Sequence, residues 1–416
     1  YLYDQGLGVK QNYKDAIKWY RLASEKKNAQ SRYNLGVLYF EGIGVKQNFK
    51  EAIKWFRLSA DQGNIRALYN LSNMYYHGLG VEQDYKEAAK LIKFSADQGY
   101  VKAQTSLGSM YRLGEGVKKD YKKAIKWYRL AAEQGGGQAK NDLGYLYSKG
   151  QGVKQDYKEA AKWYLLAAEQ GYAKAQFNLG NYYYEGQGVK LDFQKAVKWF
   201  RLSANQGHID ATRKLGIIYF IGVGVEKDKK EAAKWIRFSA EQGDAESQNL
   251  LGGFYEYGDG VKEDPKDAVK WYRLSANQGN AKAQFNLGEI YEYGNLVKED
   301  SKEAAKWYRL AADQGNSNAQ YKLGCLYYTG RGVIEDHKKA ITFFYYAADH
   351  NHSDAQLMIG MLYYKKNDYK GALKWFRLSA ENENVKAQEF LSNMYQHGLG
   401  TKKNLKEANK WELRAD

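Results

Sequence analysis

The stretch AQFNLGNYYYEGQGVKLDFQKAVKWFRLSANQG, residues 175–207, contains the pattern that decides the fold. Its first half places Ala175, Leu179 and Gly180 at spacings that bring them to one side of a helix. We expect Gly180 to let a neighbouring backbone come close, because glycine has no side chain. The Gly-Gln-Gly turn that follows has two residues free to adopt a positive φ. This half is therefore predicted to be a helix that ends in a glycine turn.

The second half of the same stretch predicts a second helix. Asp192 is well placed to cap its N-terminus, and Gly207 suits a left-handed C-terminal cap. Between them, Ala196, Trp199 and Phe200 form an apolar side. The whole stretch is therefore predicted to be a helix–turn–helix hairpin.

Tryptophan reveals how often this hairpin recurs. Ten tryptophans occupy a single position in a 36-residue period, and Leu91 and Phe343 fill that position in two further units. Before Trp375 the register shortens by four residues. The tryptophans are Trp19, Trp55, Trp127, Trp163, Trp199, Trp235, Trp271, Trp307, Trp375 and Trp411.

The cap position recurs in the same register as an Asp or Asn. A glutamate often follows three residues later, as Glu159 follows Asp156, which is capping-box spacing. One hairpin cannot bury its apolar side alone, so neighbours must stack. We therefore predict an all-α fold, an α/α solenoid wound as a right-handed superhelix of about twelve repeats. We expect residues 1–416 to form a single domain, with incomplete first and last repeats and a short, irregular repeat around 353–384.

These motifs resemble the Sel-1-like repeat family, a tetratricopeptide-type helical repeat. The family pattern A-x-x-x-L-G-x-x-Y-x-x-G-x-G-V, followed by D-Y-x-x-A-x-x-W-Y-x-x-A-A-x-x-G, matches Ala175–Gly188 and Asp192–Gly207. The resemblance implies a superhelical adaptor of the kind found in quality-control complexes, bacterial envelope assembly, host-cell interaction and signalling. Some members are immunity proteins that neutralise the toxins of rival bacteria. A cysteine-rich branch hydrolyses β-lactams, but its paired cysteines are missing here, and that activity is not transferred.

Little in the sequence indicates catalysis. Cys325 is the only cysteine, which excludes an intramolecular disulfide and a cysteine-based zinc site. The six histidines are scattered, and the adjacent pair His350 and His352 lies in a polar turn where solvation is a simpler interpretation than metal binding. No two carboxylates stand out as a general acid and base. We therefore predict no enzyme activity, no cofactor and no metal.

Charge and hydropathy narrow the partners but not the compartment. The net charge of +16 is spread over all the repeats and mixed with glutamates, which favours a solvated face over a nucleic-acid-binding stripe. No apolar segment is long enough to span a bilayer, and no signal peptide is visible. The sequence begins at Tyr1 inside a repeat, so we expect it to be a piece of a longer protein. Cytoplasm, periplasm and secretion all stay open.

Candidate binding residues lie at positions that vary from repeat to repeat. Residues that recognise a specific partner need not be the same in every repeat. In tetratricopeptide-type arrays, such variable positions on the first helix line the concave face. There the sequence places rings and carboxylates, with arginines at Arg112 and Arg213. Between Tyr145 and Tyr328, the preferred footprint, we predict these partner-binding residues: Phe177, Tyr184, Glu185, Phe220, Glu256, Tyr257, Phe285, Glu289, Glu292, Tyr293 and Tyr328.

Two interpretations of these rings stay open. Tyrosine is enriched at binding hot spots, and glutamates among the rings suit a partner with basic and apolar groups, such as a charged helix, a loop or a secreted toxin. Alternatively, some rings pack between neighbouring first helices. We predict a non-catalytic protein-binding scaffold, adaptor or inhibitor. A toxin-neutralising immunity protein is the first alternative, and a groove-based hydrolase or a nucleic-acid binder is the second.

Overall fold

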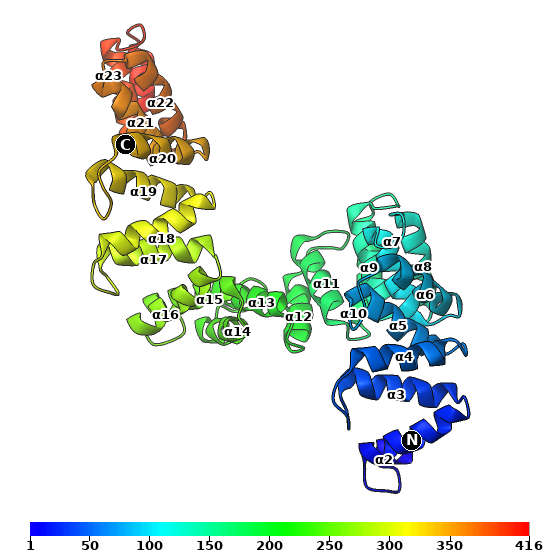
Figure 1. Ribbon diagram of the computed structural model, residues 1–416. Helices are drawn as coiled ribbons and strands as arrows, with labels where there is room; N and C mark the ends of the chain where they lie inside the picture. Colours follow the sequence, from blue (N-terminus) through cyan, green and yellow to red (C-terminus); the bar gives the residue numbers. More distant parts are fainter. Residues whose placement is uncertain (416) are drawn as a thin grey trace. The chain divides into compact units, whose positions relative to one another are not determined.

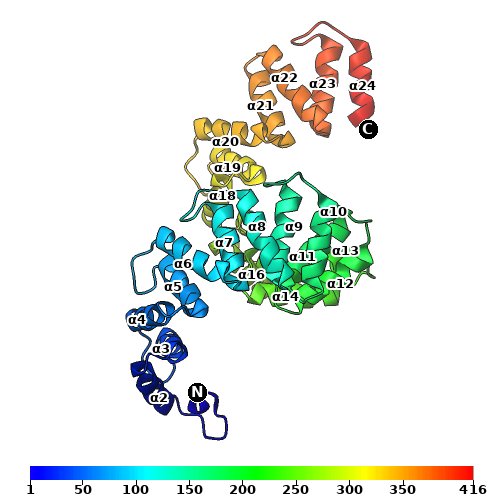
Figure 2. The ribbon, with the colours of Figure 1, turned by 90° about the vertical axis from the view of Figure 1, so that its right-hand side faces the viewer.

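The computed structural model describes residues 1–415. Helices joined by short turns make up this part of the chain, and no strand occurs within it (Figure 1). Within a unit, a helix typically packs on the helices before and after it, as α19 (Ser317–Thr329) does on α18 (Ser301–Asp313) and α20 (His337–Asp349) in both views (Figures 1 and 2). The predicted fold class, an all-α solenoid of helical hairpins, is confirmed.

First and second helices of the repeats alternate along the chain. The short helix α1 spans Leu2–Gln5. The first helices are α3 (Ala29–Glu41), α5 (Ile65–His77), α7 (Val101–Leu113), α9 (Gly137–Lys149), α11 (Ala173–Glu185), α13 (Ile209–Ile221), α15 (Ala245–Tyr257), α17 (Ala281–Tyr293), α19, α21 (Ser353–Lys365) and α23 (Val385–His397). The second helices are α2 (Tyr13–Glu25), α4 (Phe49–Ala60), α6 (Tyr85–Asp97), α8 (Tyr121–Glu133), α10 (Tyr157–Ala168), α12 (Phe193–Ala204), α14 (Lys229–Glu241), α16 (Pro265–Asn277), α18, α20, α22 (Tyr369–Glu381) and α24 (Leu405–Ala415).

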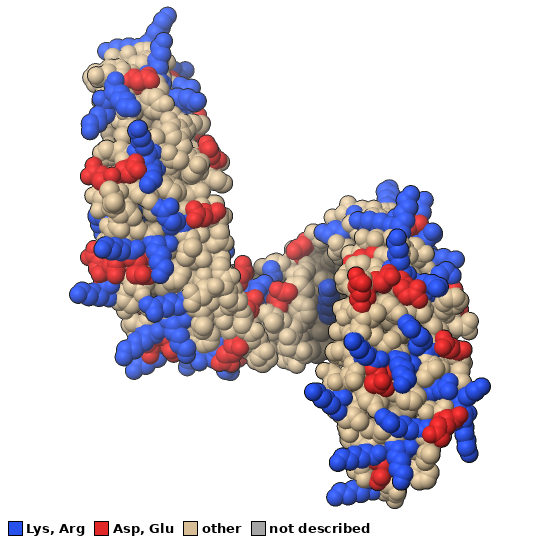
Figure 3. Space-filling view, viewed as in Figure 1, with Lys and Arg blue, Asp and Glu red and all other residues tan. Residues whose placement is uncertain are grey.

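The chain divides into two compact units, which are described separately below. Unit 1 comprises Tyr1–Ala211, and unit 2 comprises Thr212–Asp416. The expectation that residues 1–416 behave as one domain stays a prediction. On the face shown in Figure 3, lysine and arginine side chains of both units are interspersed with aspartate and glutamate.

The helix caps follow the predicted positions, with one difference. The Asp192 carboxylate accepts the Lys195 backbone N–H at 2.9 Å, and equivalent caps recur along the chain. The backbone N–H of Asp192 itself donates to the Tyr183 carbonyl at 2.9 Å. The capping-box expectation is therefore wrong, because the cap N–H is already paired across the hairpin. The glutamates pair with a lysine one turn later instead, as Glu159 does with Lys162 at 2.9 Å.

The repeated glycine of the first helix, replaced by serine at Ser72 and Ser392, makes room for a ring, which corrects the expectation of a close backbone. A Cβ on Gly180 would lie 2.6 Å from the Phe200 ring of the second helix. The same relation joins Gly288 to the Tyr308 ring, where the distance would be 2.4 Å. These rings are among the largest fully buried side chains of residues 1–415. The glycine and the ring therefore form one unit of the core, repeated along the array.

Consecutive repeats are joined by a hydrogen bond that the sequence analysis did not anticipate. The guanidinium of Arg129, on a second helix, donates to the Tyr147 hydroxyl of the next first helix at 2.6 Å. Arg237 donates to Tyr255 in the same way at 2.7 Å. The arginine follows the tryptophan by two residues, and the tyrosine is the repeated one of the first helix. These side chains therefore connect repeats instead of simply facing outward.

The irregular repeat contains the predicted tight turn. Residues 366–368 connect α21 to α22, where residues 186–192 make the corresponding connection between α11 and α12. Asn367 adopts a positive φ of 59° in place of a glycine. Asp368 still caps α22 by accepting the Gly371 N–H at 2.9 Å. The shortened turn therefore preserves the hairpin.

Candidate functional site

The structure distributes the predicted binding residues over both units. Phe177, Tyr184 and Glu185 lie on α11 in unit 1. The others lie in unit 2, on α13, α15, α17 and α19: Phe220, Glu256, Tyr257, Phe285, Glu289, Glu292, Tyr293 and Tyr328.

All three predicted phenylalanines pack against other rings of the array. The Phe177 ring is half-buried and lies 4.9 Å from the His208 ring in a stacked arrangement. Phe220 stacks on Phe254 with ring centroids 5.1 Å apart, and Phe285 tilts against the Tyr308 ring at 5.8 Å. These contacts support the alternative in which such rings fill space between helices.

The two remaining half-buried tyrosines are also in contact with second helices. The Tyr184 ring lies edge-on to Phe193 at 5.3 Å. The Tyr328 ring tilts against the His337 ring at 4.8 Å. Glu185, beside Tyr184, is exposed. A partner that contacted these rings would meet only part of each.

Tyr257 and Tyr293 differ from all of these rings. They end α15 and α17, and their exposed fractions are 72% and 60%. The ammonium group of Lys322 lies 4.6 Å from the centre of the Tyr293 ring. Large rings this exposed on successive first helices are available to a partner without any rearrangement of the core.

Two of the predicted carboxylates are already engaged by tyrosine hydroxyls. The Tyr272 hydroxyl donates to Glu256 at 2.6 Å, and the Tyr308 hydroxyl donates to Glu292 at 2.7 Å. A buried hydroxyl needs a hydrogen-bond acceptor, and each glutamate provides the acceptor for one buried tyrosine hydroxyl. Burial and the acceptor glutamate raise the pKa of both tyrosines well above the ordinary value.

Glu292 is the most buried of the predicted site residues, at 8% exposure. Besides the tyrosine hydroxyl, it contacts Lys322 at 3.2 Å and Arg331 at 3.7 Å. Lys322 lies on α19 and Arg331 in the turn that follows, so Glu292 connects two neighbouring repeats. Its role is therefore structural as well as electrostatic.

Glu289 lies one turn before Glu292 on α17 and is half-buried. Burial raises the pKa of Glu289, Lys322 acts in the opposite direction, and Glu292 and Glu256 raise it further. Within residues 1–415 no ion pair includes its carboxylate, whereas Glu292 has two cationic partners. The negative charges of Glu256 and Glu289 also raise the pKa of Tyr257, which places this ring within the same acidic field.

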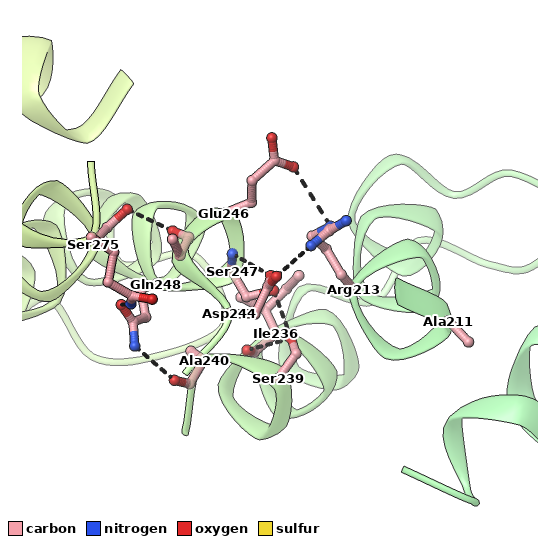
Figure 4. A network of polar contacts seen from close by, with 12 residues as sticks. Ala211, Arg213, Ile236, Ser239, Ala240, Asp244, Glu246, Ser247, Gln248 and Ser275 are labelled. Carbon is pink, nitrogen blue, oxygen red and sulfur yellow. Dashed lines mark hydrogen bonds and ion pairs between the residues drawn. The ribbon is translucent and has the colours of Figure 1, made fainter. Parts of the chain in front are cut away.

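Arg213, one of the two arginines predicted at variable positions, belongs to a polar network in unit 2 (Figure 4). Its guanidinium contacts Asp244 at 2.6 Å and Glu246 at 3.6 Å. Asp244 also caps α15 by accepting the Ser247 N–H at 2.9 Å. Burial alone would raise the pKa of Asp244, but the hydrogen bonds from Arg213 and Ser247 hold it below its ordinary value. Arg213 therefore orders a helix start.

The sequence profile of the Sel1 repeat family matches the chain throughout. The matched segments are 1–28, 29–64, 65–100, 101–136, 137–172, 173–208, 209–244, 245–280, 281–316, 317–352, 353–384 and 385–415. The chain belongs to the Sel1 repeat family. Repeats of this family generally mediate protein–protein interaction and generally form scaffolds rather than catalytic centres.

Two solved structures of Sel1 repeat proteins are similar to this one. A protective antigen present in uropathogenic Escherichia coli strains, with an SLR fold, is 36% identical, with a TM-score of 0.76 over 96% of this chain and 86% of that chain. A Sel1 repeat protein from Oxalobacter formigenes is 33% identical, with a TM-score of 0.60 over 74% of this chain and 90% of that chain. Among curated proteins, none matches this chain.

In this Sel1 repeat protein, a hollow on the first helices lies outside the predicted footprint. A groove of about 510 Å³ in unit 1 is formed by α3, α5, α7 and α9, with Ile92 from α6 and Leu79 from the turn after α5. Tyr69 and Tyr76, which line it, stand at the variable positions that the sequence analysis identified. The sequence could not predict the hollow itself, because its shape depends on how the small side chains of neighbouring helices pack against one another.

The structure adds two facts about the chemistry of this Sel1 repeat protein. No group of three or more His, Cys, Asp or Glu side chains within residues 1–415 is arranged to hold a metal ion. His352 caps α21 by accepting the Ala355 N–H at 3.3 Å and stacks on the Tyr321 ring at 4.8 Å. A separate finding concerns membranes: within residues 1–415, the helices are too short or too polar to cross a bilayer.

Proposed function

We propose that this Sel1 repeat protein is a non-catalytic scaffold that binds a partner protein through the first helices of unit 2. The observation that carries the proposal is the pair of exposed rings, Tyr257 and Tyr293, on successive first helices, together with Glu289, whose carboxylate forms no ion pair within residues 1–415. Tyrosine rings of this kind supply contact area with little loss of side-chain entropy. The general role of Sel1 repeats in protein–protein interaction supports it.

The negative charge of Glu289 on this surface indicates which kind of partner would bind there. Glu256 and Glu292 are bonded to tyrosine hydroxyls, and Glu292 is also paired with Lys322. Within the described residues, 1–415, Glu289 forms no such hydrogen bond or ion pair, and burial has already removed part of its hydration. A lysine or arginine of a partner would pair with Glu289 and contact the Tyr257 ring through a cation–π interaction. We therefore expect a partner with a basic and apolar surface, such as a positively charged helix or loop.

The experiment recovers partners on immobilised wild-type protein and then measures the dissociation constant of each purified partner. Hot-spot truncations typically cost about 2 kcal/mol or more. Tyr257→Ala and Tyr293→Ala should therefore weaken binding at least about tenfold, and Glu289→Gln should weaken it while preserving shape. Phe220→Ala is a poorer test, because Phe220 stacks on Phe254 and its removal also disturbs packing.

Two controls separate this surface from the second helices. Tyr346→Ala removes a ring of the same unit that is 51% exposed on a second helix, and it should leave binding unchanged. Lys162→Glu and Lys198→Glu reverse exposed charges on second helices and should matter little. If these reversals abolish binding while the tyrosine truncations leave it intact, the partner binds the second helices and the proposal is wrong.

The other functions stay predictions. An immunity protein that neutralises a toxin would be a special case of binding, and it requires a toxin as the recovered partner. Turnover lost on replacing Cys325 would indicate a groove-based hydrolase instead. The Cys325 thiol is half-buried and burial raises its pKa, which is the opposite of what an activated nucleophile requires.

A further inference from the structure

The groove of unit 1 has the size of a binding site and an unusual composition. Its volume of about 510 Å³ lies within the range of about 300–1,000 Å³ that is typical of ligand sites. Charged residues make up 27% of the chain, yet no Lys, Arg, Asp or Glu lines the groove. The lining does include His77, and the Glu115 carboxylate is already occupied by the Tyr76 hydroxyl. A charged group placed in the groove would lose hydration and find no Lys, Arg, Asp or Glu among the lining residues to pair with. The groove therefore favours an uncharged occupant.

Polar groups without protein partners line this groove on three successive first helices. They are Asn73 on α5, Ser106 on α7 and Gln138 on α9. None of the three side chains forms a hydrogen bond with another residue of the described chain, 1–415, whereas the neighbouring Ser72 hydroxyl donates to the Ala88 carbonyl at 2.8 Å. An amide side chain offers both a donor and an acceptor, as a peptide group does. The three groups can therefore pair with successive peptide groups of a chain that crosses the helices.

Aromatic rings complete the groove and are held in place. The Tyr76 hydroxyl donates to Glu115 at 2.5 Å, and the Tyr76 ring meets Tyr85 edge-on at 5.0 Å. The Tyr69 ring meets Tyr100 edge-on at 5.3 Å. Rings fixed in this way can accept an aromatic or aliphatic side chain without losing further conformational entropy.

We propose that the unit 1 groove binds an extended, uncharged peptide segment that carries an aromatic or aliphatic side chain. The inference rests on the proposed function, protein binding by first helices, but it assigns a second surface with a different class of partner. A neutral glycan would also match hydroxyl, amide and ring groups. The general role of the family in protein–protein interaction favours the peptide, and the glycan is an outcome of the test.

The chain provides a matched control for Asn73. Leu391–Tyr395 repeats the sequence of Leu71–Tyr75, and Asn393 occupies the position of Asn73 in unit 2, outside the groove. Asn73→Asp and Asn393→Asp therefore introduce the same charge in the same local sequence. Gln138→Glu is a second groove variant, and its exposed position makes misfolding a poor explanation of any effect.

The experiment selects a random peptide library displayed on phage against the immobilised full chain and sequences the enriched peptides. We expect uncharged segments with an aromatic or aliphatic residue. Synthetic copies should bind the wild type and the Asn393→Asp variant equally, and should bind Asn73→Asp and Gln138→Glu at least about tenfold more weakly. A neutral glycan array is tested in parallel on the wild type and on Asn73→Asp.

Several results would overturn the inference. These are net charge on the peptides whose binding depends on Asn73, equal binding of all enriched peptides by Asn73→Asp and the wild type, or binding of glycans that depends on Asn73 in the absence of peptide binding. Glu289→Gln distinguishes this inference from the proposed function. If that variant loses the peptides while Asn73→Asp retains them, the peptides bind unit 2, and the proposed function stands without this second site.

Discussion

The same repeat positions have opposite chemistry on the first helices α5 and α17. Asn73 and Glu289 both lie two residues after the repeated leucine, while Tyr76 and Glu292 both follow the repeated tyrosine. In unit 1 these positions help to form a groove whose lining contains no Lys, Arg, Asp or Glu. In unit 2, Glu289 is half-buried near the exposed Tyr257, whereas Glu292 is buried against Lys322 and Arg331.

The scaffold beneath the two surfaces is the same. Leu71 and Leu287 are both buried, with exposed fractions of 2% and 0%. The repeated tyrosines of both helices accept a hydrogen bond from an arginine of the preceding second helix. The stacked core therefore fixes the repeated positions of the first helices, while the side chains at the variable positions differ between the two units.

The largest expected effect is on stability, at Glu292. Glu292→Leu should lower the free energy of unfolding by about 3 kcal/mol, because it leaves the Lys322 ammonium and the Tyr308 hydroxyl without their acceptor. The matched change in unit 1, Tyr76→Phe, removes only the hydroxyl that donates to Glu115 and should cost about 1 kcal/mol. Urea unfolding of both variants measures the difference. Equal losses would show that Glu292 is not a structural connection.

Glycine replacement tests whether the scaffold is shared. Gly36→Ala in unit 1 and Gly288→Ala in unit 2 would place a Cβ 2.5 Å and 2.4 Å from the facing rings of Phe56 and Tyr308. Overpacking of this kind costs about 1–3 kcal/mol, so both variants should be destabilised by similar amounts. Thermal or urea denaturation checks this. A loss confined to one variant would mean that the two cores differ.

Raising the salt concentration should weaken binding at the unit 2 surface more than binding in the unit 1 groove. Raising the salt concentration from about 0.1 M to about 1 M shortens the screening length from about 10 Å to about 3 Å. Binding of a basic partner at Tyr257 and Glu289 should weaken several-fold, whereas peptide binding in the groove should change little, because no charged residue lines it. Titrations over a series of salt concentrations measure both slopes. Similar slopes would contradict the division into an acidic and a neutral surface.

The smallest expected effect is a dependence of stability on pH through His352. Burial lowers the pKa of His352 below its ordinary value of 6.5, with Asp354 acting in the opposite direction. The folded protein therefore binds a proton at His352 less readily than the unfolded chain, and stability should fall as the pH drops below about 6.5 towards the folded pKa. Protonation also removes the acceptor that caps α21, which is worth up to about 1 kcal/mol.

His352→Asn is the matched variant for this effect, because Asn316 and Asn384 cap their helices at the same repeat position. It should keep the cap and flatten the dependence of stability on pH between about 6.5 and 5. Denaturation at a series of pH values tests this. If the pH dependence of stability is unchanged in the variant, groups other than His352 cause it and the prediction is wrong.

The sequence by itself determined the hairpins, their caps and their number. Those features depend on residues three or four apart, or on a period that recurs along the chain, so Asp192, Gly207 and the tryptophans were enough to locate them. It also identified Tyr257 and Tyr293 as positions free of the scaffold, although it could not distinguish them from Phe220 or Phe285, whose rings pack on neighbouring helices.

Only the tertiary structure decided what each free position meets. Gly180 faces a ring and not a backbone, the cap N–H of Asp192 is paired across the hairpin, and Glu292 connects to Lys322, 30 residues away. The bond from Tyr76 to Glu115 spans 39 residues. Such contacts depend on how one rigid hairpin stacks on the next, and the period of a sequence does not contain that geometry. The groove of unit 1 arises for the same reason, since it exists only where the side chains of α3, α5, α7 and α9 leave space between them.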